Sequence, residues 1–345
     1  TDEFIVFYSA NSSTKNSPNP AKPLDIVLYD IKNDTKEIVL KSVSYNWQQG
    51  CRLQWIDSYE FICNIYNEQK SVYQSVIFNV KELRVKEVLS LPIYDCYKDI
   101  FGMTLNFAYL GSLAKDYGYF NLNQDKVEFD KEGLWWIDLK NSTYKLVLSF
   151  EDIVSFTENE YSRNSKHTIN HIMISPDGRR VIFIHRWYIN ERRFDRLMLC
   201  NCDGTELQTL SSGGVVSHCN WHDKHTIIGY FHKENNGLTY YKLNILTHDY
   251  EKLGSGIIDV YGDGHPSVQG NKLLFDTYPD KSAMQNLFLF DMTDCRLDKI
   301  AELKHPLEFS GSSRCDLHPR FGNNSGTFFV DSVYQGQRNL YMISK

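Results

Sequence analysis

The sequence contains no run of eighteen apolar residues, and its first ten residues, TDEFIVFYSA, lack a basic stretch followed by an apolar one. These absences argue against a membrane-spanning helix and against a secretory leader. An excess of positive charge is also missing, because 37 lysines and arginines face 43 aspartates and glutamates, for a formal net charge of −6. We therefore expect a cytoplasmic protein without a nucleic-acid or membrane partner.

Cysteine pairs at metal-binding spacing are absent as well, because none of the eight cysteines belongs to a C-x-x-C motif. Cysteines scattered through apolar, strand-like segments are typical of buried free thiols rather than of a disulfide framework or a cysteine zinc site. This usage favours a reducing compartment.

No 3.6-residue periodicity long enough for a core helix occurs, whereas 22 tyrosines and 20 phenylalanines favour strands. One pattern recurs: a strand rich in β-branched and aromatic residues, a polar turn and a second short strand. The copies begin 43 to 63 residues apart, at Leu24, Tyr73, Gly133, Arg196, Thr239, Asn286 and, truncated, Asn339. That spacing is typical of four-stranded propeller blades. The sequence therefore predicts an all-β, seven-bladed β-propeller that forms a single domain over residues 1–345, with six or eight blades as alternatives.

Each recurring hairpin is the outer half of an expected blade, and the inner pair of strands lies before it. The inner pair is plain in HIMISPDGRRVIFIHRW and HPRFGNNSGTFFVDSV, where a turn separates a short strand from a strongly apolar one. The third blade, around TLNFAYLGSLAKDYGYF, fits poorly, which indicates a long loop or a short helix. The chain begins in the second strand of blade one and stops after the third strand of blade seven, so the mode of closure stays open.

Alignment of the innermost strands places histidines in one register. Each stands three residues before an apolar position, in the pairs His171 and Ile174, His218 and Trp221, His265 and Val268, and His318 and Phe321. The same register pairs Arg52 with Trp55 in blade two and Asn106 with Tyr109 in blade three. Innermost strands line the central channel of a propeller, and their first residues lie at one mouth. We expect these side chains to converge there, although blade repetition could also copy a structural role.

Loops at the same mouth add mostly charged side chains, namely Arg186, Tyr188, Arg196, Asp276, Tyr278, Asp280, Arg314, Asp316, Arg320, Asp331 and Arg338. Imidazoles surrounded by guanidinium groups suit an acidic ligand. The residues that we expect to bind this ligand are Arg52, Asn106, Arg186, Tyr188, Arg314 and Arg320. Imidazoles and a carboxylate also suit a divalent metal ion (manganese, calcium or zinc), for which the expected ligands are His218, His265, His318 and Asp316.

Several segments stand in order in the second half: NHIMISPDGRRVIFIHRW, SHCNW, GHPS and DLHPRF, followed by FFVDSVYQGQRNLY. With these segments, residues 170–345 resemble the oligogalacturonate lyases and related polysaccharide-lyase propellers, a branch of the TolB-like propellers. The first half resembles the family only as a propeller. The resemblance implies a metal at the channel mouth that binds a uronate carboxylate, a histidine that removes the C5 proton, and loss of the 4-linked sugar by β-elimination.

In that resemblance His171 falls at the position of the family's base, and His218 and His318 match metal ligands. Two positions depart from the family, because Asp316 stands in place of a histidine and Ser313 in place of a glutamine. These departures argue against pectic oligomers as the substrate.

The chemistry constrains which groups must act together. A proton next to a carboxylate is too weakly acidic for imidazole alone, so a cation must neutralise the carboxylate. His171 as the base, with Arg196, Arg314 or a metal ion as the neutralising group, meets this requirement.

The leading hypothesis is therefore a lyase, with a glycosidase as a variant, that acts on a uronate-containing acidic oligosaccharide or polysaccharide. The alternative is a non-catalytic carbohydrate-binding or scaffold propeller in polysaccharide metabolism, since the fold serves both roles. A protein-interaction platform is a third interpretation, which the charged loops do not favour.

Overall fold

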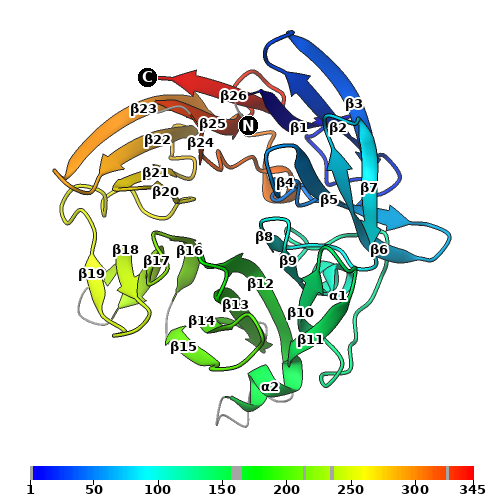
Figure 1. Cartoon of the computed structure of the whole chain (residues 1–345). Helices are drawn as coiled ribbons and strands as arrows, with labels where there is room; N and C mark the ends of the chain where they lie inside the picture. The colour runs from blue at the N-terminus through cyan, green and yellow to red at the C-terminus, as the bar shows by residue number, and fades with distance from the viewer. Residues whose placement is uncertain (1–2, 157–164, 191, 213–214, 234–236, 324–325) are drawn as a thin grey trace. The chain divides into compact units, whose positions relative to one another are not determined.

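The computed structural model describes residues 3–156, 165–190, 192–212, 215–233, 237–323 and 326–345. Across these residues the strands form seven sheets that follow one another in chain order (Figure 1). The chain therefore folds as an all-β, seven-bladed β-propeller, as the repeats predict. In the part of the chain that is described, no helix is long and apolar enough to cross a membrane.

The described chain consists of two compact units. Unit 1 comprises residues 1–174, 178–193 and 200–207, and unit 2 comprises residues 175–177, 194–199 and 208–345. The boundary runs through the fourth sheet. That the whole chain is one domain stays a prediction.

Unit 1 holds the first three sheets. They are formed by β1 (Phe4–Ala10), β2 (Leu24–Asp30) and β3 (Thr35–Ser42); by β4 (Gln54–Trp55), β5 (Glu60–Asn67), β6 (Val72–Asn79) and β7 (Arg84–Leu89); and by β8 (Asp95–Tyr97), β9 (Phe101–Thr104), β10 (Gly133–Asp138) and β11 (Tyr144–Ser149). The same unit holds the helices α1 (Phe107–Leu113) and α2 (Phe150–Ser155). The fourth sheet consists of β12 (Lys166–Ile174), β13 (Arg180–Ile189), β14 (Arg192–Asn201) and β15 (Gln208–Ser211).

Unit 2 holds the last three sheets. They are formed by β16 (Val216–Trp221), β17 (Thr226–Lys233), β18 (Gly237–Asn244) and β19 (Tyr250–Lys252); by β20 (Ser267–Gln269), β21 (Lys272–Asp276), β22 (Met284–Asp291) and β23 (Arg296–Lys304); and by β24 (Arg320–Phe321), β25 (Thr327–Ser332) and β26 (Asn339–Ser344). A short 3₁₀ helix, η1 (Gly311–Ser313), precedes β24. Among the described strands, the first and last sheets have three each, which agrees with a chain that begins in a second strand and stops after a third.

The burial pattern explains the place of each strand within a blade. In β6, which pairs with strands on both sides, six consecutive residues are buried, as expected of a central strand. The outer strand β7 is exposed except at Leu89, and its charged side chains discourage pairing with other chains.

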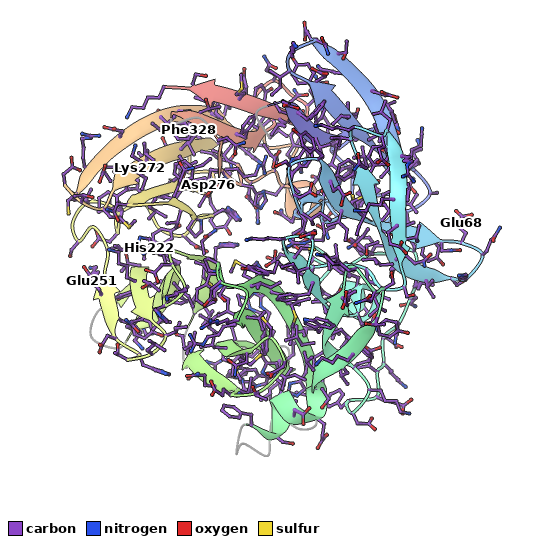
Figure 2. The ribbon with its side chains drawn as sticks, viewed as in Figure 1. Glu68, His222, Glu251, Lys272, Asp276 and Phe328 are labelled. Carbon is purple, nitrogen blue, oxygen red and sulfur yellow. The ribbon has the colours of Figure 1, made fainter. Side chains whose placement is uncertain are left out.

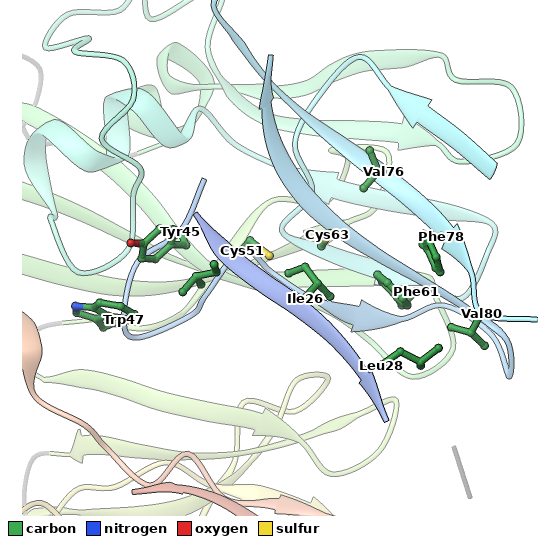
Figure 3. Packing of buried hydrophobic residues seen from close by; sticks show 11 residues of the cluster. Ile26, Leu28, Tyr45, Trp47, Cys51, Phe61, Cys63, Val76, Phe78 and Val80 are labelled. Carbon is green, nitrogen blue, oxygen red and sulfur yellow. The ribbon is translucent and has the colours of Figure 1, made fainter. Parts of the chain in front are cut away.

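One cluster of buried apolar residues joins the first two sheets, with aromatic rings of the second sheet packed within it (Figure 3). The ring of Phe61, on β5, stacks on that of Phe78 with 5.2 Å between centroids, and it meets Trp55 edge-on at 6.0 Å. Cys51 and Cys63 belong to the same core.

All eight cysteines are free thiols, as expected. Cys96 is half-buried, Cys295 is exposed and the remaining six are buried.

The third sheet differs from the predicted register. Asn106 and Tyr109 lie not on an innermost strand but at the start of α1, where the side chain of Asn106 accepts hydrogen bonds from the amides of Ala108 and Tyr109. Asparagine is favoured at this position because it satisfies amides that lack a helical partner. The innermost strand is β8, so Tyr94, three residues before Tyr97, takes the register position. The alignment of Asn106 is therefore wrong, whereas the expected short helix is confirmed.

Phe61→Ala is expected to lower the free energy of unfolding by about 3–5 kcal/mol, because it opens a cavity between Trp55 and Phe78. The matched control is Ile38→Ala on β3, where the side chain is 56% exposed and the change should stay within about 0.5 kcal/mol. Denaturant titration followed by tryptophan fluorescence measures both variants. A loss below about 1 kcal/mol for Phe61→Ala would contradict this packing.

Candidate metal centre

Three of the four register histidines meet in unit 2. His218 lies in β16, whereas His265 and His318 each stand two residues before β20 and β24. These innermost strands lie side by side. The ring centroid of His265 is 4.1 Å from that of His218 and 4.2 Å from that of His318. The three imidazoles therefore form one row with His265 at its centre.

One buried carboxylate organises this row. It belongs to Asp276, which lies at the end of β21 (Figure 2). Its Oδ1 accepts hydrogen bonds from the amide of His265 at 2.5 Å and from Nδ1 of the same residue at 3.1 Å. Its Oδ2 accepts from the amides of Leu317 at 3.0 Å and His318 at 3.2 Å. Because Asp276 is only 1% exposed, these N–H groups replace the water that its charge would otherwise require. The bond to Nδ1 leaves Nε2 of His265 to face the cluster, as in metal sites whose histidines are oriented by a carboxylate.

Gly264 permits this close approach. A Cβ atom at residue 264 would lie 1.9 Å from the carbonyl oxygen of Asp276 and 2.9 Å from its Oδ1. No side chain fits at such a distance from backbone, so only glycine allows His265 and Asp276 to pair in this way. The sequence GDGHP thus supplies a candidate ligand together with the space for its anchor.

A second carboxylate, that of Asp263, performs the same task for His218. Oδ1 of Asp263 lies 3.5 Å from Nδ1 of His218, and Oδ2 accepts a 2.6 Å hydrogen bond from the hydroxyl of Ser217. That hydroxyl lies 3.2 Å from Nδ1 of His218. Sequence reasoning missed Asp263, although an acidic residue two positions before a register histidine is a visible signal.

Three side chains offer metal-binding atoms close together. His265, His318 and Asp316 each contribute one such atom, and these atoms lie within 4.8 Å of one another. Nε2 of His265 is 4.0 Å from Oδ2 of Asp316. Two imidazoles and a carboxylate suit a first-row divalent ion and leave coordination positions open. Of the four expected ligands, His218 stands beside this group rather than within it.

The carboxylate of Asp316 already has a cationic partner. Nε of Arg314 donates to Oδ1 at 2.8 Å and to Oδ2 at 3.1 Å, and Nη2 donates to Oδ2 at 2.8 Å. Burial raises the pKa of Asp316, but the Arg314 guanidinium and the nearby histidines outweigh burial and hold the pKa at about 2. The guanidinium also lies 5.0 Å from the ring centroid of Tyr278, which is 5.9 Å from that of His265.

The imidazoles differ in their preference for a proton. Burial lowers the pKa of His318 well below its ordinary value, and the neighbouring His265 lowers it further. Burial likewise lowers the pKa of His218. Burial also acts to lower the pKa of His265, but the carboxylates of Asp276 and Asp316 outweigh it, so this pKa is raised. Without a metal ion, the central imidazole therefore has the highest affinity for a proton among the three.

The register position carries backbone strain in three blades. Arg52, His171 and His318 have φ angles of 54°, 50° and 42°, in the left-handed region that costs a non-glycine residue about 1–2 kcal/mol. At His171 the cause is a β-bulge, because the pairing of β12 with β13 shifts between Asn170 and Met173. Bulges redirect side chains out of the strand ladder and are common beside functional sites.

The other register residues meet in unit 1. The guanidinium of Arg52 lies 4.1 Å from the ring centroid of Tyr94, whose hydroxyl accepts a 2.8 Å hydrogen bond from the amide of His171. The ring of His171 packs edge-on against Tyr117 at 5.0 Å, and the guanidinium of Arg186 lies 5.7 Å from the same tyrosine. Three expected site residues thus surround two tyrosines that sequence reasoning did not select.

The remaining expected residues have other surroundings. Arg320 forms a paired hydrogen bond with Asp331, at 3.0 and 3.2 Å. Tyr188 is half-buried near the end of β13. Arg196, on β14, is only 2% exposed, and burial lowers its pKa to about 10. Such a buried guanidinium does not face solvent, so its role as a neutralising group stays a prediction.

Comparison with known structures supports the fold. Oligogalacturonate lyase in complex with manganese matches 99% of this chain and 86% of its own, with a TM-score of 0.62 and 14% sequence identity. The β-propeller domain of the Trilobed protease from Pyrococcus furiosus matches 99% of this chain and 90% of its own, with a TM-score of 0.55 and 11% sequence identity. TolB from Acinetobacter baumannii matches 99% of this chain and 77% of its own, with a TM-score of 0.46 and 12% sequence identity. No protein-family model and no curated protein sequence matches the chain. The expected resemblance to oligogalacturonate lyases is confirmed as a likeness of fold.

Asp276→Asn is expected to lower the pKa of His265 in the metal-free protein, because the carboxylate that most opposes the effect of burial loses its charge. The neutral imidazole then persists to lower pH. Titration of the histidine ring signals by NMR measures the shift. Asp280→Asn, in the exposed loop after β21, is the control and should leave the His265 titration unchanged. An identical His265 titration in Asp276→Asn and the unaltered protein would show that Asp276 does not anchor the ring.

Proposed function

We propose that this chain is a lyase-like propeller that acts on a uronate-containing acidic glycan by β-elimination, with a divalent cation held by His265, His318 and Asp316. The observation that carries the proposal is the anchored donor set, in which Asp276 holds Nδ1 of His265 and the three ligand atoms lie within 4.8 Å. Oriented ligands beside open positions are typical of metal centres that bind substrate. The fold shared with oligogalacturonate lyase in complex with manganese adds support.

The donor set fits a first-row transition ion such as manganese or zinc better than calcium, which prefers oxygen ligands alone. When bound, the ion would neutralise the sugar carboxylate and so make the neighbouring C5 proton more acidic. The protein's own contribution is to orient the imidazole rings. Asp276 and Asp263 engage the Nδ1 atoms of His265 and His218, so the Nε2 atoms remain available.

His171 is the proposed base. Its Nδ1 lies 3.0 Å from Oδ1 of Asn170. An amide oxygen can only accept a hydrogen bond, so Nδ1 carries the proton and Nε2 keeps its lone pair. A neutral imidazole in this tautomer is suited to accept the C5 proton.

The proposed reaction is balanced without an oxidant or reductant. The base takes the C5 proton, the electron pair of the C5–H bond forms the C4–C5 double bond, and the C4–O4 bond breaks. The leaving sugar oxygen takes up a proton. The unsaturated uronate that forms absorbs ultraviolet light, which supplies the assay.

A non-catalytic glycan-binding propeller is the second candidate, and one observation favours it. Arg314 pairs with both oxygens of Asp316, so this carboxylate is neutralised without a metal ion. A site that keeps this pair would bind an acidic sugar through guanidinium groups and would lack the metal that the elimination requires.

A panel of polyuronides and uronate oligosaccharides, with and without Mn²⁺, tests the lyase proposal. We expect a manganese-dependent rise in ultraviolet absorbance that falls by about 10²–10⁴-fold in His171→Ala, which lacks the base. His265→Asn should lose both the activity and the binding of Mn²⁺ measured by calorimetry, whereas His171→Ala should still bind Mn²⁺. His248→Asn, an exposed histidine of unit 2, is the control and should match the unaltered protein.

The outcomes separate the two candidates. Glycan binding without any rise in absorbance, with or without Mn²⁺, would favour the non-catalytic propeller. A rise in absorbance that is undiminished in His171→Ala would remove this histidine from the mechanism. No binding of any glycan in the panel would overturn both candidates.

A further inference from the structure

We propose that Arg314 couples the cation site to the acidic ligand: it occupies Asp316 when the cation is absent and turns to the ligand's carboxylate when the cation binds. This inference rests on the proposed function, because it assumes a cation at His265, His318 and Asp316. It adds a mechanism by which cation and ligand strengthen each other's binding.

The geometry places two cations in competition for one oxygen. Oδ2 of Asp316 accepts from Nη2 of Arg314 at 2.8 Å and lies 4.0 Å from Nε2 of His265. A metal ion on this oxygen would lie about 2.0–2.2 Å from it. The ion would then be within about 5 Å of Nη2, where a divalent charge and a guanidinium repel each other strongly. The present ion pair and a bound cation therefore oppose each other, and movement of Arg314 would relieve the repulsion.

The environment of Arg314 allows that movement. Its side chain is 39% exposed, whereas that of Asp316 is fully buried, so the arginine is the partner with more room to move. The guanidinium already lies 5.0 Å from the ring centroid of Tyr278. A guanidinium that leaves one carboxylate is best satisfied by another, and its planar fork suits the carboxylate of a uronate.

The consequence is positive linkage between the two ligands. The cation releases Arg314 for the uronate, and a uronate that holds Arg314 removes the competitor of the cation. Since coupling free energies are reciprocal, each ligand must raise the affinity for the other by the same factor. Couplings of this kind are typically about 5–150-fold.

Calorimetry with Mn²⁺ and glucuronate, each added alone and each in the presence of the other, tests the inference. For the unaltered protein we expect each ligand to tighten the binding of the other by about fivefold or more. In Arg314→Gln, Mn²⁺ alone should bind about tenfold more tightly, because the competing charge is gone. The coupling factor in this variant should fall below that of the unaltered protein, because only the direct attraction between the ion and the uronate carboxylate remains.

Two further variants separate the charge of Arg314 from its paired geometry and control for the loss of an arginine elsewhere. Arg296→Gln removes the same charge from an exposed ion pair of unit 2, and it should behave like the unaltered protein. Arg314→Lys keeps the charge but loses the paired geometry, so Mn²⁺ affinity should stay close to that of the unaltered protein while the coupling weakens. Circular dichroism of each metal-free variant verifies folding.

The outcomes distinguish this inference from the proposed function. If the unaltered protein binds Mn²⁺ but Arg314→Gln shows the same affinity and the same coupling, the role of Arg314 is overturned and the metal site stands. If Mn²⁺ binds only in Arg314→Gln, the competition is supported and the proposed function of the unaltered chain fails. If neither protein binds Mn²⁺, both are overturned.

Discussion

The candidate site depends on one buried carboxylate. Asp276 receives the amide and Nδ1 of His265 on one oxygen and the amides of Leu317 and His318 on the other. It therefore fixes the imidazole of His265 directly and His318 through the backbone amide of His318. These bonds also join the end of β21 to the segment that precedes β24. The charge is stable at 1% exposure only because these donors replace water. Gly264 follows from the same constraint, since a side chain there would occupy the space that the carboxylate needs.

The blade repeat supplies the geometry of the register, and histidine occupies the register position in four blades. Arg52, His171 and His318 share a left-handed backbone, although arginine and histidine differ in charge and shape. A left-handed non-glycine residue costs about 1–2 kcal/mol, so the surrounding sheet must hold it in place. Because an arginine and two histidines share this conformation, it does not depend on which of these residues occupies the position.

The sequence predicted the strands correctly where a repeated pattern of residues corresponds to a repeated structure. The hairpins that begin at Leu24, Tyr73 and Gly133 appear as paired strands because strand patterning and turn chemistry are local. The prediction failed at Asn106, because the spacing of apolar residues that marks the innermost strands also occurs in the first turn of α1. Asn106 caps that helix instead of beginning a strand. Sequence reasoning also could not assign the anchoring role of Asp276, because the pairing with His265 is made across a turn by atoms whose approach depends on Gly264.

The pair formed by Arg314 and Asp316 is hard to explain by stability alone. A fully buried carboxylate loses its hydration on folding, and its attraction to a half-exposed guanidinium returns only part of that cost. Apolar residues of similar volume in place of both partners would often serve stability as well. The charge is better explained by its neighbours, since His265 and His318 place nitrogen atoms within 4.8 Å of the same carboxylate. A carboxylate surrounded by imidazole donors and held at low pKa by a movable arginine is ready to receive another cation, which is the condition that the proposed coupling requires.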